Sequence, residues 1–472
     1  MSDAHRTFGS RSDQDPPGYS PAVLTRSRRP DLADALVGVT VVVAFLALLW
    51  LGRGLTFFAD EWAVMADRSI SLDSFVQPFN EHWLGVQIVV YRLMLQTFGL
   101  GSYMPYLALL AALHVVVVVE VYLIARRSTG PWVAALTAIV LAFFGSGFEN
   151  LYWAMQIGFL ISIGLGLAAV LLLDGAPTTG RTVIATGLLT VGMMTSGFGI
   201  FMLVFVGLDL LLDRGRWRVV PAMFVPGLVY VGWYVAFGRA GVANARDPFT
   251  LDAILSVPKF VVEGTGTAFG SVLGIGPQLG IVAAAVLAIG LIVQLVRRRP
   301  VPSRVFAAFG AIVVQYAILG LIRAQLFDGA AQYSRYAYVS GIFAMLGLVA
   351  LVGPRRLPAD PRRRLAAVAT IAGVFTLALV WNGWLLLAGR GIFEDRAAHT
   401  RALVAVITGE MEPGVDPNKV ILLDRTVTRL RAVIAEFGSP ITDSLAGDAV
   451  PAVDPTLVEE VRQTLRAQMA GH

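Results

Sequence analysis

Residues 35–62, ALVGVTVVVAFLALLWLGRGLTFFADEW, place a long apolar run shortly before an acidic dipeptide. A run of about 20 apolar residues crosses roughly 30 Å of hydrocarbon as a helix. Including the run at 35–55, segments of this kind recur at 103–124, 131–146, 155–173, 181–195, 198–213, 218–238, 278–296, 304–323, 336–353 and 365–389. The sequence therefore predicts an all-α, polytopic integral membrane protein with about 11 transmembrane helices.

Composition agrees with this class. Of the 472 residues, 56% are hydrophobic and 15% are charged, whereas about a quarter of a soluble chain is charged. Cysteine is absent, which excludes disulfides, thiolate catalysis and cysteine metal sites. The net charge of +5 does not indicate a nucleic-acid partner, because the basic residues lie in short runs between apolar segments. Two of the 37 basic residues are lysines (Lys259 and Lys419), a bias typical of a GC-rich bacterial genome.

The arginine runs predict the orientation in a plasma (inner) membrane. Cytoplasmic loops carry an excess of Lys and Arg, so we assign to the cytoplasm the runs at 126–127, 214–218, 297–304 and 355–364. Residues 1–34 are then a disordered basic cytoplasmic arm, and 35–389 are the transmembrane domain. Residues 390–472 form a small extracytoplasmic α/β tail, with helices expected at 394–407 and 427–437 and a strand at 419–423.

Two segments do not follow the simple count of crossings. Residues 84–100 are short and contain Gln87, Tyr91, Arg92 and Gln96. If they crossed, every later basic loop would face outward, so we interpret them as an interfacial or dipping helix. Residues 56–102 then form one long extracytoplasmic loop, although a two-helix excursion would satisfy the same parity. Residues 239–277 are interpreted as a second outer stretch.

The candidate site residues gather in the first outer loop. Asp60 and Glu61 follow the first crossing, and Glu81 and His82 precede the interfacial segment. Such acids suit a general base or a divalent cation site for Mg²⁺ or Mn²⁺, or they simply mark the outer end of a helix. Trp62 and Trp83 flank the two motifs and suit either sugar stacking or interface anchoring. Further along, Glu149 in GFENLYWAMQ lies in a polar cluster that could line a sugar pocket or form a polar turn.

The order of these motifs resembles the GT-C fold glycosyltransferases, a group that includes protein O-mannosyltransferases and aminoarabinose transferases. The resemblance rests on a basic N-terminus, a first crossing, FFADEW, NEHW, FGLGSYMPY, a crossing ending in Ala-Arg-Arg, and Tyr333-Ser334-Arg335-Tyr336 before a later crossing. It is clearest over residues 55–130 and identifies no subfamily.

The resemblance implies a function. These enzymes transfer a sugar from a polyprenyl-phosphate donor to a glycan, lipid or protein acceptor of the cell envelope. By analogy, Asp60 is the general base, and the reaction inverts the anomeric carbon. Arg335, with Tyr336 beside it, is the expected phosphate contact, because a guanidinium can bind two phosphate oxygens. The alternatives are a transporter or flippase of lipid-linked sugars and a non-catalytic envelope-assembly protein.

Overall fold

The computed structural model describes residues 31–239, 250–324, 329–354, 358–409, 418, 425–441 and 453–470. Within them the regular elements are all helical, apart from one isolated β-bridge between Phe79 and His82. Eight helical segments are long and apolar enough to cross a membrane. They are α1 (Leu32–Leu51), α5 (Met104–Ser128), η3–α8 (Ala154–Leu173), η4–α11 (Trp217–Ala236), α13 (Gly276–Val296), α14 (Ser303–Arg323), α15 (Ser334–Val352) and α16 (Pro361–Thr408). The predicted all-α membrane fold is confirmed.

Shorter helices complete the bundle, and they explain why the predicted number of crossings differs. Two predicted crossings are short apolar helices, α6 (Pro131–Ala142) and α10 (Phe198–Leu211). A third is the 17-residue helix α9 (Thr179–Thr195). The first loop carries α2 (Asp60–Asp67), α3 (Leu72–Val76) and α4 (Gly85–Phe98), and the others are η2 (Gly145–Gly147), α7 (Glu149–Tyr152), α12 (Leu251–Leu273), η6 (Ala330–Gln332), α17 (Val427–Phe437) and α18 (Pro455–Ala470).

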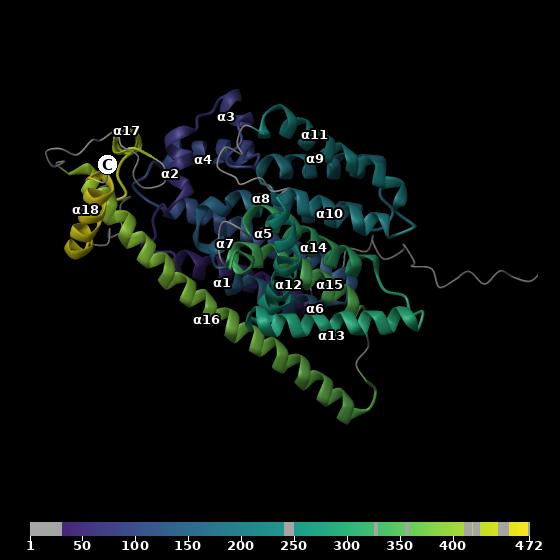
Figure 1. The fold of residues 1–472 in the computed structure, drawn as a ribbon. Helices are drawn as coiled ribbons and strands as arrows, with labels where there is room; N and C mark the ends of the chain where they lie inside the picture. The colour runs from purple at the N-terminus through teal and green to yellow at the C-terminus, as the bar shows by residue number, and fades with distance from the viewer. Residues whose placement is uncertain are drawn as a thin grey trace, which may run out of the picture.

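The bundle has two chemically different ends. In Figure 1, α2, α3, α17 and α18 lie at one end of the long helices. We call this the site end. At the other end, the C-termini of α5 and α8 meet the N-terminus of α14, where Arg127, Asp174 and Arg304 interact. We call this the basic end.

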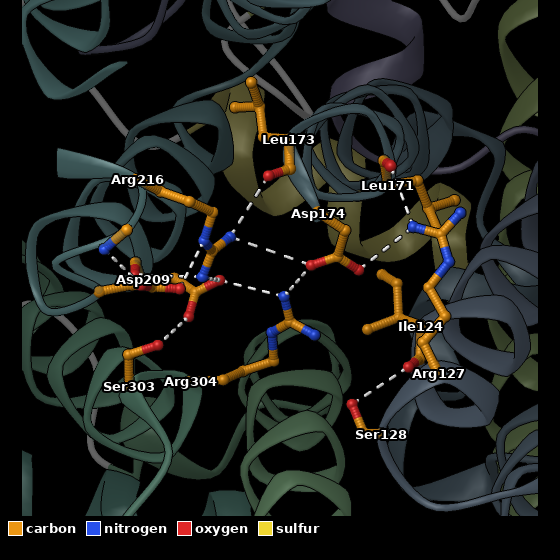
Figure 2. A network of polar contacts seen from close by, with 12 residues as sticks. Ile124, Arg127, Ser128, Leu171, Leu173, Asp174, Asp209, Arg216, Ser303 and Arg304 are labelled. Atoms are coloured by element: carbon orange, nitrogen blue, oxygen red, sulfur yellow. Dashed lines mark hydrogen bonds and ion pairs between the residues drawn. The ribbon is translucent and has the colours of Figure 1, made fainter. Parts of the chain in front are cut away.

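An ion cluster joins the helices at the basic end (Figure 2). Arg304 Nη2 lies 2.5 Å from Asp174 Oδ1 and 3.0 Å from Asp209 Oδ2. Arg216 Nη2 contacts the same Asp209 oxygen at 3.2 Å, and Arg127 Nη1 contacts Asp174 Oδ2 at 3.2 Å. Since these side chains come from different helices, the cluster fixes the ends of α5, α8, α10 and α14 relative to one another.

Helix α1 begins inside the segment predicted to be a disordered arm. Asp31 caps it by accepting the N–H groups of Ala33 and Asp34, and the Asp34 carboxylate accepts the N–H of Asp31 in return. Arg126 of α5 binds both Asp31 and Asp34. The capping box and these ion pairs therefore start the helix at Leu32, and residues 1–30 of the predicted arm lie outside the described residues.

A helix also occupies most of the stretch 239–277, which the sequence analysis left as an outer loop. Helix α12 packs along α13, where Gly266 and Gly270 meet Gly276 and Gly280. A Cβ on Gly280 would lie 1.9 Å from the carbonyl oxygen of Gly266. Only glycine permits this backbone approach, which is how small residues join helices in membranes. The glycine spacing, rather than hydropathy, was the signal for this pair.

Of the four polar residues that suggested an interfacial helix, Gln87, Tyr91 and Arg92 of α4 are buried, whereas Gln96 is exposed. Gln87 donates to the Met155 carbonyl at 2.7 Å, and Arg92 donates to the Met65 carbonyl at 3.2 Å. Leu93 is instead about half exposed. The buried polar residues of α4 therefore contact α2, η3 and the C-terminal segment, and the interfacial placement of the helix stays a prediction.

The C-terminal segment continues the bundle without a break at residue 390. Helix α16 has 48 residues and is therefore about 72 Å long. It passes diagonally beside the bundle and ends near α17 and α18 (Figure 1). The tail is anchored to the first loop, because Leu100 N–H donates to the Phe437 carbonyl at 2.8 Å. The predicted strand at 419–423 lies outside the described residues.

Candidate active site

A cavity of about 690 Å³ lies at the site end. Its wall is built from the first loop, the α7–η3 segment, and parts of α10, α11, α14, α15 and α16. Among the residues predicted from sequence, six line it: Asp60, Glu81, His82, Glu149, Arg335 and Tyr336. Chain segments separated by more than 250 residues thus bring most of the predicted site together.

Asp60 is the acid that faces the cavity with a free carboxylate. It is the first residue of α2 and follows Ala59, which has a φ of 51°. This left-handed conformation is costly for a residue with a side chain, and the only other described non-glycine residues with positive φ are Asn80, which also lines the cavity, and Arg298. Among the described residues, no hydrogen bond or ion pair engages the Asp60 carboxylate.

The surroundings of Asp60 favour a proton acceptor. Burial raises the pKa of its carboxyl group above the usual value, while the charges of Arg335, Arg323 and Arg425 act in the opposite direction. A base works best when its pKa approaches the working pH. Asp60 therefore presents to the cavity a carboxylate whose pKa is shifted toward neutral pH.

Glu61 points away from Asp60, and the expectation that it acts in the reaction or shares a metal is not supported. Successive helical residues are about 100° apart around the axis, and Glu61 is fully buried. Tyr91 and Tyr103 donate their hydroxyls to Oε1, the latter at 3.0 Å, and Phe58 N–H donates to Oε2 at 2.6 Å. Burial raises the pKa of Glu61 to about 8. Glu61 is therefore a neutral acid whose hydrogen bonds fix the first loop on the side away from the cavity.

The residues do not fit the predicted divalent cation site. Asp60 is surrounded by arginines instead of further acids, and Glu61 is held by tyrosines. Within the described ranges, no group of three or more His, Cys, Asp or Glu side chains could hold a metal ion. We therefore derive no step through Mg²⁺ or Mn²⁺.

Glu81 and His82 form a second charged group in the cavity with Arg323 at the end of α14. Arg323 forms an ion pair with Glu81, and His82 Nε2 lies 3.4 Å from the same Glu81 oxygen. Desolvation lowers the pKa of His82, so its imidazole is neutral at pH 7. The group is thus a fixed polar wall with donors for hydroxyl groups.

Glu149 positions Arg335. Its Oε2 accepts the Ser334 hydroxyl at 3.0 Å and the Arg335 N–H at 3.1 Å, which caps the first turn of α15. Its Oε1 lies 3.3 Å from Arg335 Nη1. The Arg335 guanidinium lies over the rings of Tyr333, Tyr336 and Trp153 at 4.7, 5.3 and 5.9 Å. Arg335 is therefore held at the cavity wall by one carboxylate and three aromatic faces.

The two tryptophans predicted as sugar contacts are structural. Trp62 is buried, and its Nε1 donates to the Phe57 carbonyl at 3.3 Å. Trp83 is buried and stacks on Trp233, with ring centroids 5.0 Å apart and planes 6° apart. Neither lines the cavity. Phe58, Trp153 and Phe198 supply its aromatic surface instead.

Arg396, which no sequence pattern indicated, reaches the cavity from α16. It follows the last predicted crossing, which ends at residue 389, and no sequence pattern placed it near Asp60. A cation–π partner two residues before the acidic motif, Phe58, contacts it, but only the fold brings the two segments together.

Comparisons with known proteins now bear on the fold. No family model and no curated protein matches the sequence. Among solved structures, ArnT from Cupriavidus metallidurans in the apo state is 15% identical, with 85% of each chain covered and a TM-score of 0.52. ArnT bound to undecaprenyl phosphate gives 17% identity, 84% coverage of each chain and a TM-score of 0.49.

An archaeal structure is also similar. The oligosaccharyltransferase AglB from Archaeoglobus fulgidus, in complex with an inhibitory peptide and a dolichol-phosphate, is 13% identical over 89% of this chain and 61% of that chain, with a TM-score of 0.45. The likeness to apo ArnT shows that the chain has the GT-C fold, as the order of motifs predicted.

Proposed function

We propose that this protein is a membrane glycosyltransferase that moves a sugar from a polyprenyl-phosphate donor to a hydroxyl of a cell-envelope acceptor. The observation that carries the proposal is that Asp60 and Arg335 line the same cavity. The charge of Arg335 acts to lower the pKa of Asp60, and the charge of Asp60 acts on Arg335 in return. Among the described residues, the two side chains nevertheless form no direct ion pair. A base and a phosphate-binding cation that line one cavity without pairing directly are what an in-line displacement requires.

The chemistry follows from these two groups. Asp60 takes the proton of the acceptor hydroxyl, and the acceptor oxygen forms a bond to the anomeric carbon. The bond from that carbon to the phosphate oxygen breaks, and its electron pair leaves on the phosphate. Arg335 stabilises this developing charge. Attack opposite the leaving group inverts the anomeric configuration.

The remaining cavity wall suits such a donor. Val231 of α11 and Ile318 and Ile322 of α14 give the cavity apolar lining, which supports binding of a prenyl chain. On the polar side, Glu81, His82 and Arg323 offer hydrogen bonds to sugar hydroxyls. The chain presents both surfaces within one cavity.

The test uses purified protein in lipid vesicles with a set of labelled polyprenyl-phosphate sugars and an envelope extract as acceptor. Asp60→Asn keeps the shape of the side chain but cannot take a proton, so transfer should fall about 10²–10⁴-fold. Thermal stability and binding of the lipid should be unchanged. Asp73→Asn, at an exposed acid of the same loop, is the matched control and should transfer normally.

Two outcomes would contradict the proposal. Near-normal transfer by Asp60→Asn would remove the base from the mechanism. Movement of a fluorescent lipid-linked sugar across the bilayer by wild-type protein, without any transfer, would favour the transporter alternative. The enzyme is favoured because the described ion pairs gather at the two ends of the bundle, whereas transporters concentrate charge near the midplane.

A further inference from the structure

The C-terminal half of α16 supplies a second arginine to the candidate site. Arg396 lines the cavity, and its side chain is 32% exposed. The guanidinium carbon lies 4.8 Å from the ring centre of Phe58 and 4.8 Å from that of Phe393. Cation–π contacts on two rings hold this side chain in place before any ligand arrives.

Arg396 and Arg335 share a single carboxylate oxygen. Glu149 Oε1 lies 3.3 Å from Arg335 Nη1 and 3.9 Å from Arg396 Nη1. The other Glu149 oxygen is occupied by Ser334 and the Arg335 backbone. Two guanidinium groups therefore share one carboxylate at this wall of the cavity, and among the described residues neither forms an ion pair with Asp60.

Aromatic contacts connect this pair to the catalytic loop. Trp153, whose ring lies under Arg335, donates its Nε1–H to the Phe58 carbonyl at 3.2 Å. Phe58, whose ring lies under Arg396, precedes Asp60 by two residues. The two arginines and the base are therefore held in a fixed relation by one continuous set of contacts.

We propose that Arg396 binds the phosphate of the lipid donor together with Arg335, and that Glu149 keeps both guanidinium groups apart and aimed into the cavity. This inference rests on the proposed function and adds a binding residue to it. A phosphate diester carries one negative charge, which the two arginines can bind while they share the Glu149 carboxylate. Two planar guanidinium groups can contact several phosphate oxygens at once.

The test measures binding without chemistry. Wild-type protein and variants in nanodiscs are titrated with a polyprenyl phosphate and with the uncharged polyprenol of the same chain length. Arg396→Gln should weaken binding of the phosphate about tenfold or more, since one charge-assisted hydrogen bond contributes about 1.5–3 kcal/mol. Binding of the polyprenol should not change. Arg396→Lys should retain part of the affinity, because the charge stays while the planar contacts are lost.

Arg390→Gln is the matched control. Arg390 lies on the same helix, pairs with Glu394 at 2.7 Å and packs over Trp50, outside the cavity lining. It should bind both lipids as wild type does. Unchanged phosphate binding by Arg396→Gln would overturn the proposal, and so would an equal loss for phosphate and polyprenol, which indicates packing alone.

The result is separable from the fate of the proposed function. If transfer is absent or Asp60→Asn transfers normally, the enzyme proposal fails while the binding difference at Arg396 is still measured. If wild-type protein binds the phosphate no better than the polyprenol, the role of Arg396 is refuted directly. Thermal melting of each variant identifies any that fail to fold, and Arg396→Lys then supplies the comparison.

Discussion

Charged side chains gather at both ends of this bundle, and the two groups are built in opposite ways. At the basic end, the cluster of Arg127, Arg216 and Arg304 with three aspartates satisfies its carboxylates. Both oxygens of Asp209 are bound, Oδ1 by the Ser303 hydroxyl at 2.8 Å and Oδ2 by two arginines (Figure 2). At the site end, Asp60 has no such partner, although three arginines lie near enough to affect its pKa.

This difference distinguishes charged groups that hold the fold together from a charged group that is available for a reaction. Buried charges that are fully paired hold helices together, and removing one partner leaves another uncompensated. A buried carboxylate left unpaired costs stability, so the fold keeps it only where surrounding contacts impose it. At the site end, Glu61 and its tyrosines impose that geometry on the loop. An unpaired carboxylate that lines a cavity, rather than the number of charges, is therefore what distinguishes the site end.

The two ends should also lie on opposite sides of the membrane, which is an all-or-none prediction. Asp73→Cys in α3 and Thr179→Cys at the start of α9 place single thiols on exposed positions of this cysteine-free chain. Because the arginine runs predict a cytoplasmic basic end, an impermeant thiol reagent should label Asp73→Cys in intact cells. Thr179→Cys should react only after lysis. Labelling of both in intact cells would refute the orientation.

Breaking the ion cluster should have the largest effect on stability. Arg304→Met removes one of the two arginines that contact both Asp174 and Asp209. It leaves a negative charge of the cluster uncompensated and should lower the free energy of unfolding by about 3–5 kcal/mol. The remaining folded protein should transfer sugar normally, because the cluster is at the far end from the cavity. Thermal melting in detergent, beside a transfer assay, measures both. The exposed Arg297→Met at the same end should melt as wild type does; an equal loss would show a non-specific effect.

Arg335→Lys, at the site end, should show the opposite pattern: weaker ligand binding with little change in stability. An ammonium keeps the charge but cannot retain both the Glu149 contact and the planar stacking on Tyr333 and Tyr336. Binding of a polyprenyl phosphate should weaken about tenfold, which corresponds to about 1.4 kcal/mol. Melting should change little, because Glu149 still caps α15 through the backbone. Wild-type affinity in Arg335→Lys would mean that a point charge suffices at this position.

Sequence alone predicted the features that depend on interactions between residues close together in the chain. Local signals were sufficient for the helix at 427–437 and for most membrane helices, because hydropathy and caps act within a few residues. They also indicated Asp60, Glu149 and Arg335, which line one cavity. Which of two adjacent acids faces the cavity could not be predicted, since that depends on Tyr91 and Tyr103. Arg396 was missed because its proximity to Phe58 exists only in the tertiary structure.

Glu61→Gln tests the role of Glu61 in holding the Asp60 loop through the pH dependence of stability. The folded-state pKa of Glu61 is raised to about 8 from 4.5 by burial, so the folded protein holds a proton there that the unfolded chain has lost. Stability therefore falls as pH rises from about 4.5 to about 8. Gln stays neutral, so the variant should lack this fall. The melting temperature at several pH values measures it, and an unchanged slope in Glu61→Gln would place the titrating group elsewhere.

The smallest expected effect concerns Arg425, which binds Asp67 at the far end of the helix that begins with Asp60. Its charge lowers the pKa of Asp60, after the larger effects of Arg335 and Arg323. Arg425→Gln should therefore raise that pKa and move the acidic limb of the transfer rate to higher pH, by less than Arg335→Gln does. Stability should change by less than about 1 kcal/mol, since the pair is partly exposed.

Arg429→Gln is the control for this shift. Arg429 Nε also contacts Asp67, at 3.3 Å, but its charge is not among those that act on Asp60. If the limb moves with Arg425→Gln and stays in place with Arg429→Gln, the C-terminal segment tunes the base by charge. Equal shifts in both variants would show that the segment acts by holding α2 in position. The comparison thus decides whether the tail contributes electrostatics to the site or only its geometry.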